Sequence, residues 1–173
     1  MRRVFWAIGV SEAVRRATRS LPGQVTDPAW RWTPEANLHV TLKYLGETEL
    51  ELEALVAPVR ALLPRPALDL ELQGTGTFGR PPRVAWVGLG GPGAEPLQAL
   101  AADLDAVATG LGFEPERRGF TPHLTVARAR RGQRPRPLRA PLDAVSFRAR
   151  DLRLLESRAG QPYATLASLP LGG

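Results

Sequence analysis

His39-Val40-Thr41-Leu42 returns in the second half of the chain as His123-Leu124-Thr125-Val126. The chain has two histidines, and these two segments contain both of them. Because successive side chains of a β-strand point to opposite faces, each segment predicts a strand with two apolar residues on one face. The other face presents an imidazole beside a threonine hydroxyl. If the two halves of the chain face each other, both imidazoles and both hydroxyls meet in one cleft.

This combination of groups suits the cleavage of a phosphate ester. An imidazole has a pKa close to neutrality, so one histidine can accept a proton while the other donates one. Thr41 and Thr125 can donate hydrogen bonds to the non-bridging phosphate oxygens, where negative charge increases in the transition state. We therefore interpret His39 and His123 as an acid and base pair that requires no metal or other cofactor.

Two other interpretations of the histidines have less support. Each histidine alone could be a satisfied polar residue at a strand end, with threonine nearby because threonine suits strands. Two copies of the pattern, one in each half, favour the catalytic interpretation. Two histidines are too few ligands for most zinc sites, and no neighbouring acidic residue stands at an obvious ligand spacing. No metal site is predicted.

Apolar patterns around these segments predict a mixture of strands and helices. We expect strands over residues 3–8, 38–45, 67–72, 83–89, 123–127, 144–149, 151–155 and 163–169, and helices over 11–20, 48–63 and 94–111. A capping box at Thr48 and Glu51 begins the second helix, and Pro58 bends or ends it. A loop rich in Gly, Pro and Thr is expected over 74–82.

The order of these elements predicts an α+β fold, because strands and helices do not alternate regularly. It also suggests a duplication, since each half has strand, helix and strand elements and one histidine-bearing strand. With 173 residues, of which 43% are hydrophobic, we expect a single domain over residues 1–173, built as two similar lobes.

Composition narrows the classes of partner and compartment. The chain has no cysteine, which fits a reducing compartment and predicts the cytoplasm. It has no signal peptide pattern and no apolar run long enough to cross a bilayer. The net charge of +6 favours polyanionic partners, nucleic acid first, although abundant arginine also fits a compositional bias. We expect a monomer, because no large unexplained apolar stripe remains.

Beyond the two histidine segments, the chain resembles a known family over nearly its whole length. It is similar to the LigT-like RNA 2',3'-cyclic phosphodiesterases, also called 2'-5' RNA ligases, of the 2H phosphoesterase superfamily. The matching segments occur in family order at residues 3–8, 37–47, 76–79, 82–86, 120–128 and 154–157, with Tyr163 near the end. Tyr44 stands where this branch often has phenylalanine.

The resemblance implies a fold, an activity and a mechanism. The fold is α+β and bilobal, with two pseudo-symmetric lobes of antiparallel sheet plus helices around a central cleft. The activity is hydrolysis of an RNA 2',3'-cyclic phosphate end to a 2'-phosphate, without metal or ATP. In the family's scheme the first histidine, here His39, protonates the leaving 3' oxygen, and the second, His123, deprotonates water. If an RNA 5'-hydroxyl replaces water, a 2'-5' linkage forms. The two local motifs are too alike for the sequence alone to assign these roles.

Four further residues are candidates for substrate contact. Lys43, the only lysine, is expected to share a strand face with His39, where it can bind phosphate or lie solvated at the strand end. Strict alternation places Arg128 on the face opposite His123, so it reaches the phosphate only if a bulge or the end of the strand redirects its side chain. Tyr44 and Phe120 are candidates for stacking on a base, with core packing as the alternative.

The remaining basic and aromatic residues have two interpretations each. Residues 128–139 contain many arginines. These arginines could bind an RNA backbone, or the segment could be an exposed loop of an arginine-rich protein. Trp6, Trp30, Trp32 and Trp86 are assigned to packing, with some room for a ligand role at Trp30 and Trp32. Besides the leading hypothesis, two alternatives stay open. The same residues could act on a small cyclic nucleotide or a 2'-5' oligonucleotide, or the chain could be a non-catalytic RNA-binding module.

Overall fold

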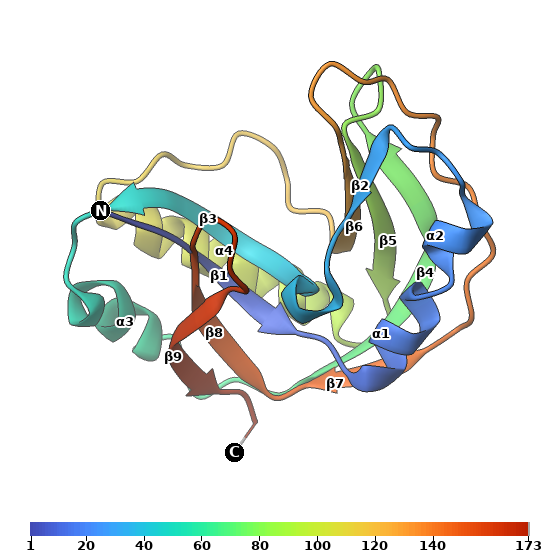
Figure 1. The fold of residues 1–173 in the computed structure, drawn as a ribbon. Helices are drawn as coiled ribbons and strands as arrows, with labels where there is room; N and C mark the ends of the chain where they lie inside the picture. Colours follow the sequence, from blue (N-terminus) through green and yellow to red (C-terminus); the bar gives the residue numbers. More distant parts are fainter. Residues whose placement is uncertain (173) are drawn as a thin grey trace.

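Two antiparallel β-sheets, each covered on one face by helices, form the framework of the molecule (Figure 1). The computed structural model describes residues 1–172. The strands are β1 (Arg2–Gly9), β2 (Trp30–Trp32), β3 (His39–Thr48), β4 (Leu68–Phe78), β5 (Val84–Gly90), β6 (His123–Ala129), β7 (Ser146–Ala149), β8 (Asp151–Ser157) and β9 (Ala164–Pro170). The helices are α1 (Glu12–Thr18), α2 (Leu21–Gln24), α3 (Leu52–Arg60) and α4 (Ala94–Gly110), with a 3-10 turn η1 at Glu35–Asn37. The expected α+β class is confirmed.

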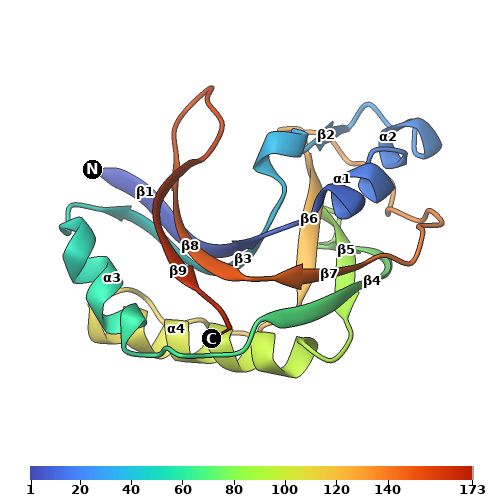
Figure 2. The ribbon, with the colours of Figure 1, turned by 90° about the horizontal axis from the view of Figure 1, so that it is seen from below.

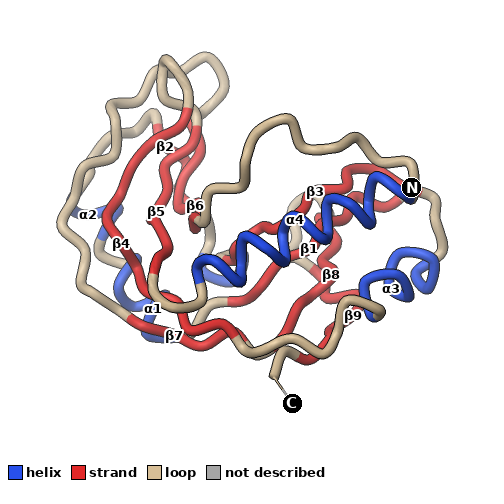
Figure 3. The backbone as a smooth tube through the Cα atoms, turned by 180° about the vertical axis from the view of Figure 1, so that it is seen from behind, coloured by secondary structure: helices blue, strands red, loops and turns tan. Residues whose placement is uncertain are grey.

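The first sheet has the strand order β3-β1-β8-β9, and we call it the His39 sheet because β3 begins at that residue. Helix α4 runs along one face of it (Figure 3), where Leu97, Leu100 and Leu104 are buried. From β1, Trp6 and the other apolar residues of the same face join this core. The other face is left to line a cleft.

The second sheet has the strand order β2-β6-β5-β4-β7, and we call it the His123 sheet because β6 begins at that histidine. Helices α1 and α2 lie against it, at the end of the molecule away from α3 (Figure 2). Val14 of α1 and Leu21 of α2 are fully buried in the core together with Leu124 of β6. No helix within residues 1–172 is long and apolar enough to span a membrane.

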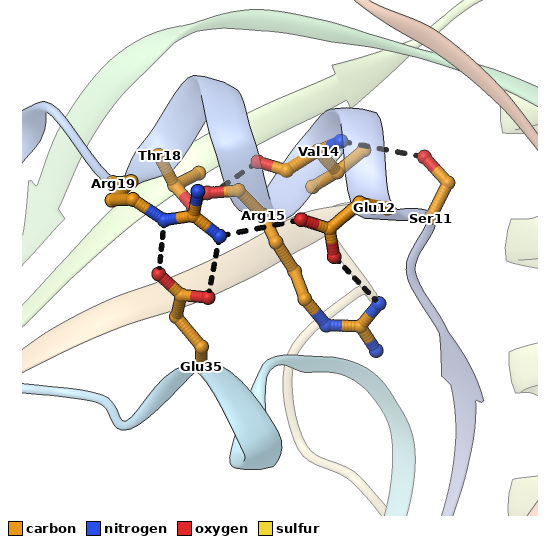
Figure 4. Close-up of polar contacts among 7 residues, drawn as sticks. All are labelled: Ser11, Glu12, Val14, Arg15, Thr18, Arg19 and Glu35. Atoms are coloured by element: carbon orange, nitrogen blue, oxygen red, sulfur yellow. Dashed lines mark hydrogen bonds and ion pairs between the residues drawn. The ribbon is translucent and has the colours of Figure 1, made fainter.

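Polar contacts fix α1 at both ends (Figure 4). The Ser11 hydroxyl caps the helix by accepting the N–H of Val14 at 3.3 Å, as expected for a helix that begins there. After its last turn, Arg19 donates to both carboxylate oxygens of Glu35, at 2.5 and 2.8 Å. Glu35 belongs to η1, which leads into β3. The pair therefore connects a helix of the His123 sheet to the segment that positions His39, although half-exposed pairs of this kind stabilise little.

The two sheets do not correspond to the two halves of the chain. The His39 sheet combines β1 and β3 with β8 and β9 from the C-terminal end, and the His123 sheet includes β2 from the N-terminal part. Helices α1 and α2 follow β1 in the sequence but pack on the His123 sheet. Helix α4 follows β5 but packs on the His39 sheet. The bilobal arrangement is confirmed, but each lobe draws on both halves, so a duplication with one lobe per half does not describe the structure.

The expected capping box before α3 is wrong. The hydroxyl of Thr48 accepts the N–H of Leu50 at 3.1 Å, and the N-cap of the helix is Glu51, which makes no side-chain capping bond. The pattern Thr-x-x-Glu therefore lies one turn too early to cap the helix. Pro58 lies inside α3, which ends two residues later at Arg60, in agreement with the expected early end.

The expected loop over residues 74–82 begins only after Phe78, because β4 continues through Gly74. Gly74 has a φ of 63°, a conformation that glycine adopts without strain, and the pairing of β4 with β5 shifts register between Gln73 and Thr75. Glycine therefore makes a bulge here instead of ending the strand. Trp30 and Trp32 lie outside the strands expected from the sequence, but they form the ends of the short edge strand β2.

Candidate active site

Each histidine is held by the backbone two residues before it. His39 Nδ1 lies 2.6 Å from the carbonyl oxygen of Asn37, and His123 Nδ1 lies 2.7 Å from that of Thr121. A carbonyl only accepts hydrogen bonds, so in the neutral imidazole Nδ1 carries the proton and Nε2 is the acceptor. At His39, Nε2 also lies 2.8 Å from the hydroxyl of Thr41. In both imidazoles, Nε2 is therefore the nitrogen that the backbone leaves for proton transfer.

A β-bulge in β6 brings Arg128 to the face of His123. Strand β5 pairs Trp86 with Thr125 and Ala85 with Ala127, so the residue between them, Val126, is an extra one. Along β5, residues 84, 86 and 88 share a face, and their partners in β6 are residues 128, 125 and 123. His123, Thr125 and Arg128 therefore project from the same face. Such a bulge is one of the two conditions under which the sequence pattern allows Arg128 to reach the phosphate.

The corresponding bulge in β3 acts in the opposite way on Lys43. Strand β1 pairs Ala7 with Thr41 and Trp6 with Lys43, which leaves Leu42 as the extra residue. Lys43 thus shares the face of Trp6, which is the buried face, and is 2% exposed. The expectation that it lies beside His39 is wrong. Tyr44 takes that place instead, five residues after His39 as Arg128 is after His123.

The ammonium group of Lys43 is bound by acidic partners away from the cleft. Its Nζ lies 2.8 Å from an Asp105 carboxylate oxygen, 3.2 Å from one of Glu116 and 2.8 Å from the carbonyl of Glu114. Burial lowers the pKa of Lys43, but its hydrogen bonds to Asp105 and Glu116 outweigh this, so the net shift is upward. Lys43 therefore anchors β3 to α4 and the segment that follows it.

Replacing Lys43 with methionine tests this structural role. The variant keeps most of the buried stem and loses the ammonium group, so we expect the free energy of unfolding to fall by about 1–3 kcal/mol. Catalytic activity, measured where the variant is folded, should stay unchanged. Urea unfolding gives the first quantity, and Glu116→Gln is the matched control with a smaller loss, because Glu116 is half-exposed. Lost activity at full stability would return Lys43 to the phosphate site.

Aromatic rings surround both imidazoles in a similar way. The ring of Tyr163 meets His39 edge-on with centroids 5.1 Å apart, and Phe78 meets His123 edge-on at the same separation. Phe5 lies 4.9 Å from His39. These contacts hold each ring in a fixed orientation. The sequence placed Phe5, Phe78 and Tyr163 in family-like segments but assigned them no role, because cross-strand neighbours do not follow from local patterns.

Trp86 lies on the cleft face of the His123 sheet rather than in the core. It pairs with Thr125 on one side and with Gly76 on the other. A Cβ atom at Gly76 would lie 2.3 Å from the indole ring, so only glycine leaves room for it. The indole Nε1 is buried and, within residues 1–172, has no hydrogen-bond partner. The structure therefore revises the assignment of Trp86 to simple core packing.

One charge acts on both histidines. Burial lowers the pKa of His39 and of His123 below the usual value, and the positive charge of Arg128 lowers each further. The hydrogen bonds from Nδ1 to the carbonyls oppose this shift. Because β3 and β6 approach each other closely, and Arg128 projects from the face of His123, we infer that the two histidines flank one site with the guanidinium on its His123 side.

The other candidates are placed less centrally. Tyr44 is 51% exposed and stacks on Phe5, so one face of its ring is open to a ligand. Phe120 is half-buried and packs against the core. Within residues 1–172, no group of three or more His, Cys, Asp or Glu side chains is arranged to hold a metal ion.

The structure has two sheets, and in each of them one strand carries a histidine and a threonine on the face that lines the cleft. This arrangement defines the 2H phosphoesterase class of proteins. Comparison with known proteins gives the family. A model described as the 2'-5' RNA ligase superfamily matches residues 10–161, which include both histidine segments. The chain belongs to this superfamily.

Individual relatives agree with that assignment. The RNA 2',3'-cyclic phosphodiesterase of Aeropyrum pernix is 35% identical over 144 residues, covering 76% of this chain and 81% of that protein. The protein of the same name from Escherichia coli is 33% identical over 132 residues, covering 73% and 71%. The crystal structure of E. coli LigT complexed with 3'-AMP is similar over 99% of both chains, with a TM-score of 0.82 at 27% identity. The resemblance to the LigT-like branch is confirmed.

Proposed function

We propose that this protein is an RNA 2',3'-cyclic phosphodiesterase that opens a terminal cyclic phosphate to a 2'-phosphate, with His39 and His123 as its acid and base. One observation carries the proposal: two imidazoles, each with Nδ1 bound to a carbonyl, lie on closely approaching strands, and Arg128 projects from the face of His123. In a protonated His39, Nε2 donates to the Thr41 oxygen, so the Thr41 hydroxyl hydrogen stays available to the phosphate. The names of the A. pernix and E. coli relatives support the substrate class.

In the proposed reaction a water molecule attacks the phosphorus atom of the cyclic phosphate. A bond forms between phosphorus and the water oxygen, and the bond between phosphorus and the 3' oxygen breaks. The neutral histidine takes the proton from water, while the protonated one gives its proton to the 3' oxygen. The products are a 2'-phosphate and a 3'-hydroxyl. The family resemblance supports His39 as the acid and His123 as the base.

The remaining groups of the cleft bind the charge of the phosphate. Thr41 and Thr125 share the faces of their histidines, so their hydroxyls can donate to the non-bridging oxygens. Arg128 presents a planar, permanently charged group that suits the same oxygens. We propose these three as phosphate ligands, and Tyr44 as a surface on which a base can stack.

The same site supports ligation when a different nucleophile attacks the cyclic phosphate. If an RNA 5'-hydroxyl takes the place of water, the histidines act on that hydroxyl and a 2'-5' linkage forms. Because the cyclic phosphodiester already holds the energy of the bond, no nucleotide cofactor is needed. We propose ligation as a secondary activity, and the cytoplasm and a monomeric state stay predictions.

An assay on a defined RNA end tests the proposed function. The purified protein is incubated in EDTA with an oligonucleotide that ends in a 2',3'-cyclic phosphate, and the product is analysed by mass and by 2'/3' isomer tests. We expect a terminal 2'-phosphate, because the histidine pair transfers protons without a metal. Loss of activity in EDTA that zinc restores would contradict the metal-free mechanism.

A substrate panel separates the alternatives in the same experiment. Turnover of a small cyclic nucleotide or of a 2'-5' oligonucleotide, with the RNA end unchanged, would keep the chemistry and replace the substrate. Salt-dependent RNA binding without turnover of any substrate would leave a non-catalytic RNA-binding module.

A further inference from the structure

Two arginines face each other across β2 and β6. The register pairs Arg31 with Arg128, and both side chains are exposed. The neighbouring pair, Trp30 with Ala129, places a buried indole on the opposite face. Since paired residues of an antiparallel sheet share a face, Arg31 and Arg128 both project from the face that carries His123.

This arrangement brings two positive charges together without compensation. Like charges directly opposite each other in a sheet are destabilising. Within residues 1–172, neither guanidinium forms an ion pair with a carboxylate, whereas Arg153, also on a cleft face, is bound by Asp151 at 2.6 Å. A bound anion would remove the repulsion, so the pair is suited to a phosphate group.

The position of the pair relative to the reaction centre indicates which phosphate. Arg128 projects from the same face of β6 as His123 and Thr125, which places it beside the groups proposed to contact the cyclic phosphate. Strand β2 is the edge of its sheet, and Arg31 lies one strand spacing, about 4.8 Å, further out. A group that extends from the cyclic phosphate past Arg128 therefore meets Arg31 next, and in RNA the next anion along the chain is a phosphodiester.

We propose that Arg31 binds the phosphodiester that joins the terminal nucleotide to its neighbour, and that Arg31 thereby makes the protein prefer RNA ends over free cyclic nucleotides. This inference rests on the proposed function of the cleft. It assigns Arg31 to substrate binding and not to proton transfer, so its effect depends on the length of the substrate.

The test compares substrates with and without that phosphodiester. We measure kcat/KM of the Arg31→Gln variant on a mononucleoside 2',3'-cyclic phosphate, on a dinucleotide that ends in a cyclic phosphate, and on the same dinucleotide with a neutral methylphosphonate linkage. We expect a loss of about 10-fold or more on the charged dinucleotide, through KM, and no change on the other two. The melting temperature should stay the same or rise, because a like-charge contact is removed.

A matched control removes the same charge elsewhere on the sheet. Arg148 on β7, paired with Asp69 of β4, is exposed at the opposite edge, four strands away from β2, and Arg148→Gln should leave all three substrates unaffected. An equal loss on the mononucleotide and the dinucleotide would overturn the proposal, because Arg31 would then serve the cyclic phosphate itself. An unchanged value on the charged dinucleotide would overturn it as well.

Binding separates this inference from the proposed function. The affinity of the wild type and of Arg31→Gln for an uncleavable RNA dinucleotide is measured by fluorescence anisotropy at several salt concentrations. Weaker binding by the variant with a smaller salt slope supports the subsite even if no turnover is detected on any substrate, which would refute the enzyme alone. Equal binding by both proteins refutes the subsite alone.

Discussion

Replacing His39 or His123 with alanine is expected to lower kcat/KM on an RNA 2',3'-cyclic phosphate by at least about 10³-fold. A positioned proton transfer contributes about 10²- to 10⁴-fold to a rate, and each variant loses one of the two transfers. The double variant should lose little more than either single one, because an acid and a base that act in one step are not additive. Single-turnover kinetics on a labelled oligonucleotide measures the effect.

The pH profile of weakened variants assigns the two roles. The acid must be protonated, so its loss removes the fall of kcat/KM at high pH, and loss of the base removes the fall at low pH. If His39 is the acid, His39→Asn loses the high-pH limb. Asparagine can still donate to the Asn37 carbonyl, so the fold should be preserved, as judged by the melting temperature. Activity above a tenth of the wild type in both alanine variants would contradict a two-histidine mechanism.

Replacing Arg128 with glutamine is expected to lower kcat/KM by about 10- to 100-fold and to move its pH profile upward. A hydrogen bond to a charged group contributes about 1.5–3 kcal/mol, which sets the size of the loss. The shift follows from electrostatics: a cation beside an imidazolium disfavours the protonated form and lowers the pKa. Burial, the larger cause, stays in the variant, so the pKa values of His39 and His123 rise only in part towards the usual value.

The wild type should accordingly be most active on the acidic side of the usual histidine pKa, where one imidazole is protonated and the other neutral. Arg128→Lys is the matched control, because it keeps the positive charge and loses the planar fork. We expect that variant to lose activity without a shift of the pH profile. An unshifted profile in Arg128→Gln would mean that the guanidinium does not influence the protonation of the two histidines.

Much of the site could be predicted because its residues alternate regularly. Val40 and Leu124 are fully buried, as the strand pattern requires, and the histidines and threonines lie on the other face. This alternation is a local property of the backbone, so a tetrapeptide is long enough to reveal it. The prediction that two such strands face each other relied on the repeat, and the structure agrees.

The sequence could not reveal where the alternation breaks. One extra residue, Leu42 in β3 and Val126 in β6, exchanges the faces of the residues directly after it, so Lys43 turned into the core and Arg128 towards the cleft. A bulge is defined by the register of two strands, and the partner strands are distant in sequence. For the same reason the pairing of Arg31 with Arg128 had no local signal.

Strand pairing also explains why the composition of the lobes was not predicted. Each half of the sequence contains enough strands for a sheet, and nothing local indicates that β8 pairs with β1 or that β2 pairs with β6. The resemblance to a family supplied the bilobal shape. We propose that residues 1–173 form one bilobal domain, because each sheet takes strands from both halves of the chain.

The exchange of segments between the two sheets has a consequence for how the cleft behaves. Two lobes that are joined by one linker can open and close by a hinge motion. In this protein the backbone passes several times from one sheet to the other. Because several chain segments connect the two lobes, there is no single hinge about which the lobes can turn. We therefore expect the distance between the two imidazoles to be set when the chain folds and to change little when a substrate binds.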